Sequence, residues 1–432
     1  MDSDSDDVFV GAHTPKTAQK RGPKVDRATD PRTPWSRTDW DGHVQAKLRE
    51  GSWHTYYHMP VASFDKLHAL LFCESDREKD LAISRAQNST PMGAIVTQVK
   101  LASTLRQYFG EKHKSMVDVF KISSTSCHAA FLNVTERINT TFDGDLYATD
   151  HSDAVLAARA HAFAQRSAYP TIMRHCVGAI DGLLIKTIQP KAQEVGNVRS
   201  FYSGHKKGFG VNMQGVCDSQ CRFIGFSCNT AGSTSDYVAF RHGFFYGHWP
   251  SLPAPFYYIG DCAYPLSPKC LTPYVGTQLP PDQDAFNFFH SQMRITIERT
   301  FGIFVNVFSI FQTPLKFTIA NTCNLVEACV KLHNYRIDEG CQHVTRKATS
   351  GAIFREAWGR SDDVFDILDD ARYLTHRPHA TDASYAQHVA GAEMYSGLNP
   401  SDAPGGIARR AALTEALHQA GAARPAANVI RE

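Results

Sequence analysis

This chain of 432 residues lacks an excess of charge of either sign. Its 45 Lys and Arg residues stand against 43 Asp and Glu residues, which gives a formal net charge of +2. A protein that binds nucleic acid through bulk charge is strongly basic, so any contact with nucleic acid here must come from local basic patches. Hydrophobic residues make up 43% of the chain, which is typical of a globular protein, and the length allows roughly two or three domains.

Long hydrophobic runs are also absent. The most apolar stretch, residues 301–320, is broken by polar residues and a proline, so it is a poor membrane span. The first residues, MDSDSDD, contain no secretory hydrophobic segment. We therefore expect a protein without a membrane partner.

The eleven cysteines include no CxxC pair. Cys217 and Cys221 flank an expected hairpin turn at a spacing that zinc could use. No matching second pair follows, which favours buried thiols over a zinc site. Unpaired thiols are typical of a reducing compartment, the nucleus or the cytosol.

Composition and periodicity divide the chain into four parts. Residues 1–38 hold an acidic cluster followed by bases among prolines and threonines, and are expected to be a disordered tail. The basic segment QKRGPK is a nuclear-import signal, a loose DNA-binding arm or a solvated stretch. Residues 39–150 are expected to be helical, and residues 163–340 to form a mixed domain. Residues 345–432 are expected to be a weakly structured C-terminal tail, in which only residues 354–373 favour a helix.

The helical part contains a pattern compatible with a helix-turn-helix, for which a plain helical bundle is the alternative. In the DNA-binding interpretation, Arg137 and Asn133 are the best base readers. The pattern consists of an apolar stripe from Ile95 to Leu105, a break at Gly110, the short segment MVDVFKI, and a helix over residues 124–142 with Ser123 as its N-cap.

The third part alternates strand and helix patterns. The order strand, hairpin, helix, strand, helix is that of a ribonuclease H-like core. The expected fold class is therefore α/β (α+β), with a ribonuclease H-like mixed sheet and flanking helices, preceded by an all-helical N-terminal region. Strands are expected at residues 176–188, 209–217, 222–228 and 255–260, and helices at 233–242, 286–304 and 326–337.

Three acidic residues stand in distinctive settings: Asp181 in VGAIDGLLI, Asp261 in FYYIGDCAYPLSP and Glu298 in FNFFHSQMRITIERTFG. An acid on an apolar strand is costly to bury unless it is paired or binds a metal. In a ribonuclease H-like sheet the first strand can lie beside the fourth, which would bring both aspartates together. Glu298 would come from a helix packed on the sheet. Oxygen ligands suit Mg²⁺ or Mn²⁺, and two such ions could cleave a phosphodiester.

Each acid also has a simpler interpretation. Asp181 could be a turn acid, and Asp261 could be a helix N-cap. Glu298 could form an ordinary i,i+4 ion pair with Arg294. Their joint appearance in this order favours a metal site.

The same segments resemble a known family. Upstream, WHTYYHMPVASFDKL and the expected helices of residues 95–142 are similar to its helical N-terminal region. Residues 163–338 resemble the transposase domain of the PIF/Harbinger class, the DDE superfamily endonuclease family that includes the Harbinger transposase-derived nucleases. The matching pieces are AYPTIMRHCVGAIDGLLIKTIQP, FYSGHKKGFGVNMQGVCD, AGSTSDYVAF, YIGDCAYPLSPKCLTPY, FNFFHSQMRITIERTFG and ACVKLHNYRID.

The resemblance implies that Asp181, Asp261 and Glu298 bind two divalent metal ions, Mg²⁺ or Mn²⁺, and catalyse DNA cleavage and strand transfer. It also implies a nuclear protein that acts with a separate Myb-like DNA-binding partner protein, and a homo-oligomer is compatible with it. Asp236, in AGSTSD, matches a further acid of the family. It either lies behind the catalytic acids or is a helix N-terminal charge.

The resemblance also marks several basic residues. Lys206 and Lys207 either contact DNA phosphates or belong to a plain loop. Arg294 and Arg299 either contact phosphates or orient the acid between them. His333, in LHN, is expected to support the fold near the site.

One departure from the family pattern bears on activity. After Glu298 the family carries basic residues before a Phe, whereas this chain reads FGIFVNVFSIF, with Val305 and Val307 at those positions. The missing bases favour a domesticated DNA-binding or scaffold protein that does not cleave, and the complete acid triad opposes it. A ribonuclease H-like nuclease acting on RNA is a further alternative.

Overall fold

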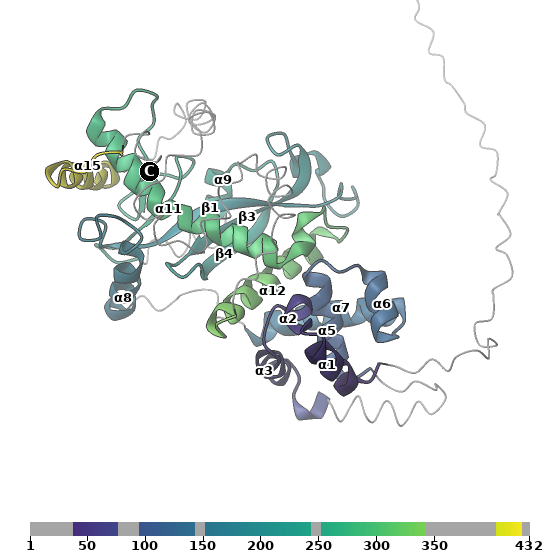
Figure 1. Cartoon of the computed structure of the whole chain (residues 1–432). Helices are drawn as coiled ribbons and strands as arrows, with labels where there is room; N and C mark the ends of the chain where they lie inside the picture. The colour runs from purple at the N-terminus through teal and green to yellow at the C-terminus, as the bar shows by residue number, and fades with distance from the viewer. Residues whose placement is uncertain (1–37, 77–94, 143–151, 243–251, 342–402, 426–432) are drawn as a thin grey trace, which may run out of the picture. The chain divides into compact units, whose positions relative to one another are not determined.

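The computed structural model describes residues 38–76, 95–142, 152–242, 252–341 and 403–425 (Figure 1). All of these residues belong to one compact unit, Arg37–Glu432. Apart from Thr38, the tail expected at residues 1–38 lies outside the described residues, as does the helix expected at 354–373.

The N-terminal part is all-helical, as the sequence predicts. Apolar side chains at helical spacing, among them Trp53 and Phe64, are buried and hold these helices together. Helices α5, α6 and α7 pack against one another. Ser123 caps α7, as expected, by accepting a hydrogen bond from the amide of Ser126 at 3.0 Å. The helices are α1 (Trp40–Arg49), α2 (Trp53–Tyr57), α3 (Val61–Leu71), α5 (Thr97–Tyr108), α6 (His113–Phe120) and α7 (Ser124–Thr141).

The second part is built on a six-stranded mixed sheet, which confirms the expected ribonuclease H-like class. Strand β1 is central: it pairs antiparallel with β3 on one side and parallel with β5 on the other. Strands β4 and β2 pair with β3, and β6 extends the sheet beyond β5. The strands are β1 (Cys176–Lys186), β2 (Tyr202–Ser203), β3 (Gly208–Cys217), β4 (Phe223–Ala231), β5 (Tyr257–Ile259) and β6 (Cys270–Leu271).

Side chains of β1 alternate between the two faces of the sheet, because successive residues of a strand point in opposite directions. Ile180 packs with Phe240 and Tyr264 on one face. Ala179 belongs to the main core, which includes α11. Asp181 has the parity of Ala179 and therefore points toward α11.

Helices flank the sheet, and their packing positions the long helix α11 across it (Figure 1). Helix α11 contacts β1, β3 and β5, α12 packs on β4 and α7, and α9 contacts β3 and β4. No helix in the described ranges is long and apolar enough to cross a membrane. The helical elements are α8 (Asp153–Ala164), the 3₁₀ turn η2 (Val198–Phe201), α9 (Asp236–His242), α11 (Pro281–Val307), the 3₁₀ turn η4 (Ser309–Gln312) and α12 (Ile319–Asp338).

The C-terminal part differs from the expected weakly structured tail at one place. Helix α15 (Pro404–Gln419) packs on α11 and β6 (Figure 1). Its Leu417 is buried against Phe286 and Phe289. A sequence rich in Ala, Gly and Pro shows little helical periodicity, and this helix is stabilised by tertiary packing, which sequence composition does not reveal.

Candidate active site

Asp181 and Asp261 lie at the same level of adjacent parallel strands. The register of β1 and β5 pairs Ala179 with Ile259. Each aspartate follows two residues later on its own chain segment, so both point to the same face of the sheet. The expected meeting of the first and fourth strands is therefore observed.

Backbone amides hold both aspartates in place. The amide of Gly182 donates to Oδ1 of Asp181 at 2.8 Å, and the amide of Ala263 donates to Oδ1 of Asp261 at 2.9 Å. Asp261 is only 4% exposed. A buried carboxylate that accepts backbone hydrogen bonds keeps one orientation, as a ligand or a catalytic group must.

Helix α11 brings Glu298 and Arg294 to the aspartates. The two residues are one helical turn apart and share a face. Nη1 of Arg294 donates to Oδ2 of Asp181 at 2.9 Å, and Nη2 donates to Oε1 of Glu298. The ion pair expected within the helix is therefore present, and it extends to the central strand.

The charges of the three acids and of Arg294 influence one another. Burial raises the pKa of Asp181 to about 7; Arg294 opposes this rise, while the carboxylates of Asp261, Glu298 and Asp236 add to it. Burial alone would lower the pKa of Arg294, but the carboxylates of Glu298, Asp181 and Asp261 raise it above its ordinary value. The site thus concentrates negative charge around a single guanidinium.

The donor chemistry of this site fits a divalent metal. Its carboxylate oxygens are the ligands that Mg²⁺ and Mn²⁺ prefer, and they already surround a stand-in cation, the guanidinium of Arg294. Within the described part of the chain, no group of three or more His, Cys, Asp or Glu residues is arranged to hold a metal ion as it stands.

Asp236 lies behind Asp181, at the first residue of α9. Its Oδ1 accepts hydrogen bonds from the side-chain amides of Asn212 at 3.1 Å and Gln214 at 2.8 Å. A Cβ atom on Gly182 would lie 2.1 Å from the same oxygen. Both interpretations of Asp236 from the sequence therefore apply: it is a helix N-terminal charge, and it supports the strand segment that carries Asp181.

Gln214 is a residue of the site that the sequence did not single out. It is 1% exposed and joins two neighbours, because its amide donates to Asp236 and its Oε1 accepts from the hydroxyl of Tyr264. Tyr264 follows Asp261 in the segment GDCAY. The available signal was a pair of amide side chains, Asn212 and Gln214, at alternate positions of an otherwise apolar strand.

His333 and Asn334 support the fold, and His333, which the sequence also places near the acids, contacts the turn between β3 and β4 instead. Nε2 of His333 makes a hydrogen bond with the carbonyl of Cys221 at 2.8 Å. The side chain of Asn334 accepts from the amide of Phe223 at 2.9 Å and donates to its carbonyl at 2.7 Å. Both residues thus tie α12 to the turn between β3 and β4 and do not lie among the acids.

Arg299 acts electrostatically on the same turn, because burial raises the pKa of the Cys221 thiol and the charge of Arg299 opposes that rise. Arg294 makes hydrogen bonds to the acids Asp181 and Glu298.

Lys206 and Lys207 lie in the hairpin between β2 and β3. Lys207 is exposed and adopts a left-handed conformation with φ 49°. Tyr202 of β2 is 43% exposed, and its ring packs edge-on against Phe209 at 5.2 Å. Strand β3 begins beyond the last residue of β1, Lys186, so the hairpin projects from the end of the sheet.

The two valines that replace expected bases have a packing role. Val307 is 3% exposed and belongs to the main core, and the partly buried Val305 packs against that core. A charged side chain at position 307 would be costly to bury. Position 307 is buried, so a valine there does not take a basic side chain away from the surface.

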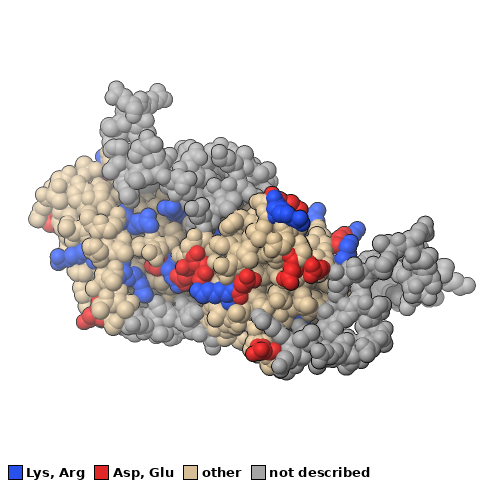
Figure 2. Space-filling view, turned by 60° about the horizontal axis from the view of Figure 1, so that its bottom comes forward, with Lys and Arg blue, Asp and Glu red and all other residues tan. Residues whose placement is uncertain are grey.

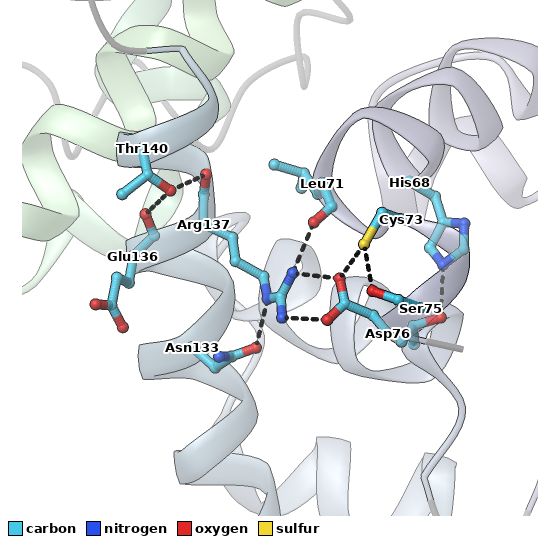
Figure 3. Close-up of polar contacts among 10 residues, drawn as sticks. His68, Leu71, Cys73, Ser75, Asp76, Asn133, Glu136, Arg137 and Thr140 are labelled. Carbon is cyan, nitrogen blue, oxygen red and sulfur yellow. Dashed lines mark hydrogen bonds and ion pairs between the residues drawn. The ribbon is translucent and has the colours of Figure 1, made fainter. Parts of the chain in front are cut away.

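Arg137, the expected base reader of α7, is engaged within the protein (Figure 3). Its guanidinium donates to the carbonyl of Leu71 at 2.9 Å and to both carboxylate oxygens of Asp76 at 2.9 and 3.1 Å, and Nε donates to Asn133 at 3.1 Å. A bidentate pair of this kind fixes the guanidinium. This arrangement favours a structural role for Arg137, which connects α7 to the end of α3.

Charged side chains are mixed on the surface. On the described part of the face in Figure 2, Lys and Arg side chains alternate with Asp and Glu side chains, and most of that surface carries neither. This agrees with the balanced composition of the chain. Contact with a nucleic acid would therefore depend on local groups such as the hairpin of Lys206 and Lys207.

Comparison with known proteins identifies the domain. Protein ALP1-like from Arabidopsis thaliana is 26% identical to this chain over 179 residues, which are 38% of the chain and 43% of that protein. The chain thus matches less than half the length of this relative, and no solved structure matches it. Residues 180–334 match the family model of the DDE superfamily endonuclease. Since that segment contains all three acids and most of the sheet, the chain carries a DDE superfamily endonuclease domain, in agreement with its resemblance to the PIF/Harbinger class.

Proposed function

We propose that this chain is a transposase-like, metal-dependent endonuclease that cleaves DNA phosphodiester bonds by a two-metal mechanism. The observation that carries the proposal is the meeting of Asp181, Asp261 and Glu298, from three elements, around one enclosed cation. Like charges that gather in a folded protein are compensated by a cation or by uptake of a proton. Such a cluster at the centre of a ribonuclease H-like sheet suits metal-assisted hydrolysis.

The three acids would hold Mg²⁺ or Mn²⁺, which when bound activates water or a 3′-hydroxyl and stabilises the leaving oxygen. The chain itself supplies orientation. The amides of Gly182 and Ala263 fix one oxygen of each aspartate. Packing of α11 on β1 and β5 fixes the position of Glu298 relative to the sheet. Asp236 and Gln214 hold the strand segment behind the acids in place.

DNA contacts are proposed at two places. Lys206 and Lys207 project from the end of the sheet, where their charges suit backbone phosphates. Arg294 lies at the acids themselves, whereas the electrostatic effect of Arg299 on Cys221 favours a structural role for Arg299. The segment QKRGPK supports a nuclear location. The resemblance to the PIF/Harbinger class supports a Myb-like DNA-binding partner and a homo-oligomer.

Nicking of supercoiled plasmid in the presence of Mg²⁺ or Mn²⁺ tests the proposal. The shape-conserving variants Asp181→Asn, Asp261→Asn and Glu298→Gln are expected to lower the nicking rate by at least about a thousandfold, since each removes a charged ligand. Asp65→Asn, at an exposed site on α3, serves as the control and should cut like the wild type. Nicking that persists in all three acid variants would exclude this site. Preferential cutting of an RNA–DNA hybrid would redirect the assignment to RNA.

A second function, DNA binding or scaffolding without cleavage, is favoured by one observation. Arg294 lies among the acids, where a cutting enzyme needs metal. The same assay separates the two functions. If the protein is a scaffold, the wild type and Asp181→Asn should bind DNA equally well, and neither should nick it.

A further inference from the structure

Arg294 is the positively charged residue that lies among the acids of the candidate site. Its side chain is 15% exposed and donates to Asp181 on β1 and to Glu298 on its own helix. The carboxylate of Asp261 also acts on it electrostatically. One guanidinium therefore interacts with every acid of the triad, and it contacts Asp181, which lies 113 positions away in the chain.

We propose that Arg294 is an internal counter-ion that occupies the metal position of the resting protein, and that metal binding displaces its guanidinium toward a DNA phosphate. The inference rests on the proposed function, of which it specifies the resting state. It assigns Arg294 a positioning role that an ordinary helix ion pair would not have.

Charge balance supports the exchange. The three carboxylates together carry three negative charges when ionised, and one guanidinium compensates only one of them. A divalent ion compensates more charge in a smaller volume, and it needs the same oxygens that now accept from Nη1 and Nη2. Guanidinium and metal ion therefore compete for Oδ2 of Asp181 and Oε1 of Glu298.

The position of Arg294 on α11 gives its side chain a route outward. The neighbouring Ile295 is 37% exposed, so the helix reaches solvent beside the site. An arginine side chain is long and flexible, and its planar donor group suits bidentate contact with a phosphate. Displacement from the acids would thus bring the guanidinium toward solvent, where a phosphate could meet it.

A purely structural ion pair is a weaker explanation. A buried ion pair contributes little net stability, because desolvation of both charges offsets their attraction. The chain has a structural ion pair elsewhere, the partly exposed pair of Arg137 and Asp76, where one carboxylate meets one guanidinium. At Arg294 three carboxylates meet one guanidinium, which leaves an excess of negative charge that a structural pair would not need.

Binding of Mn²⁺ to the full chain without DNA, measured by isothermal titration calorimetry, tests the inference. Arg294→Met removes the competing charge and should tighten Mn²⁺ binding by at least about tenfold. Arg294→Lys keeps the charge but loses the planar fork that now contacts Asp181 and Glu298, so its affinity should lie between those of Arg294→Met and the wild type. Arg137→Met removes an ion-paired arginine away from the acids and should leave Mn²⁺ affinity unchanged.

The phosphate contact has a separate measurement. With plasmid DNA, Arg294→Met should nick more slowly despite its tighter Mn²⁺ binding, and Arg294→Lys should recover part of the rate. Equal or weaker Mn²⁺ binding by Arg294→Met would overturn the inference, and if circular dichroism shows that this variant is unfolded, the affinity of Arg294→Lys decides instead. A wild type that never nicks, combined with tighter Mn²⁺ binding by Arg294→Met, would remove the proposed function and leave the counter-ion role in place.

Discussion

The space behind Asp181 depends on the absence of a side chain at Gly182. A Cβ atom there would lie 2.1 Å from Oδ1 of Asp236 and 2.8 Å from Nε2 of Gln214. Gln214 is buried, Asp236 is partly buried, and the two are hydrogen-bonded to each other, so neither can yield without weakening that hydrogen bond. The glycine after Asp181 is therefore explained by close approach of its neighbours.

The substitution Gly182→Ala should lower the free energy of unfolding by about 1–3 kcal/mol, as overpacking of a buried site does. Urea denaturation followed by circular dichroism measures this. Gly196→Ala is the matched control, since nothing lies within 4 Å of the added Cβ, and it should change stability by less than about 0.5 kcal/mol. Equal stability of the two variants would contradict the account of Gly182.

At the scale of elements, strand order could be predicted because each step has a strong signal. The apolar runs of β1 and β5 and the polar turn between β3 and β4 mark the strands, and the acids on β1 and after β5 meet because their strands are parallel neighbours. The network of Gln214 could not be predicted, since hydrogen bonds between side chains of distant elements leave no periodicity. The docking of α15 on α11 could not be predicted either, because contacts between distant elements leave no periodicity.

That network links three elements: β3 through Gln214, α9 through Asp236, and the segment after β5 through Tyr264. Gln214→Leu leaves a buried carboxylate oxygen and a buried hydroxyl each with one partner fewer, which should cost about 1–3 kcal/mol. Tyr264→Phe should cost less once Gln214→Leu is present, because the shared hydrogen bond is already lost.

A double-mutant cycle in urea should therefore give a coupling energy of at least about 0.5 kcal/mol between Gln214 and Tyr264. The comparison cycle pairs Gln214→Leu with Tyr335→Phe, which removes a buried hydroxyl that donates to the carbonyl of Ser63 at 2.7 Å. These two changes should be additive. A coupling near zero in the first cycle would mean that the hydrogen bond between Gln214 and Tyr264 does not link the elements.

At the scale of the whole molecule, distant parts of the chain share one core. The ring of Phe131 on α7 stacks on Phe317 before α12, at 5.2 Å. Nζ of Lys331 on α12 donates to the carbonyl of Asn139 at 2.6 Å. The helical N-terminal part is thereby joined to the endonuclease domain, so α7 uses one face for packing inside the protein. Its remaining exposed surface contains Leu132.

Helix α15 makes a similar connection from the other end of the chain. Arg409 donates to the carbonyls of Pro255 and Pro268 at 2.9 and 2.7 Å. Arg410 donates to the carbonyls of Thr272 and Pro273 at 3.2 and 2.9 Å, and its guanidinium lies 4.0 Å from the ring of Tyr274. These contacts lie on both sides of the segment that begins with Asp261. Docking of α15 thus braces the segment that carries the second acid.

Leu417→Ala should loosen this brace, because Leu417 is fully buried against α11 and its truncation should cost about 2–5 kcal/mol of packing. Trypsin cleaves after Arg409 and Arg410 only when α15 detaches, so cleavage there should become at least about tenfold faster. Glu415→Ala, on the exposed face of the same helix, should leave the rate unchanged. If Leu417→Ala also slows plasmid nicking, the brace acts on the segment of Asp261; unchanged nicking with faster proteolysis would limit α15 to a stabilising role. Equal trypsin rates in wild type and Leu417→Ala would mean that the packing of Leu417 does not hold α15 in place.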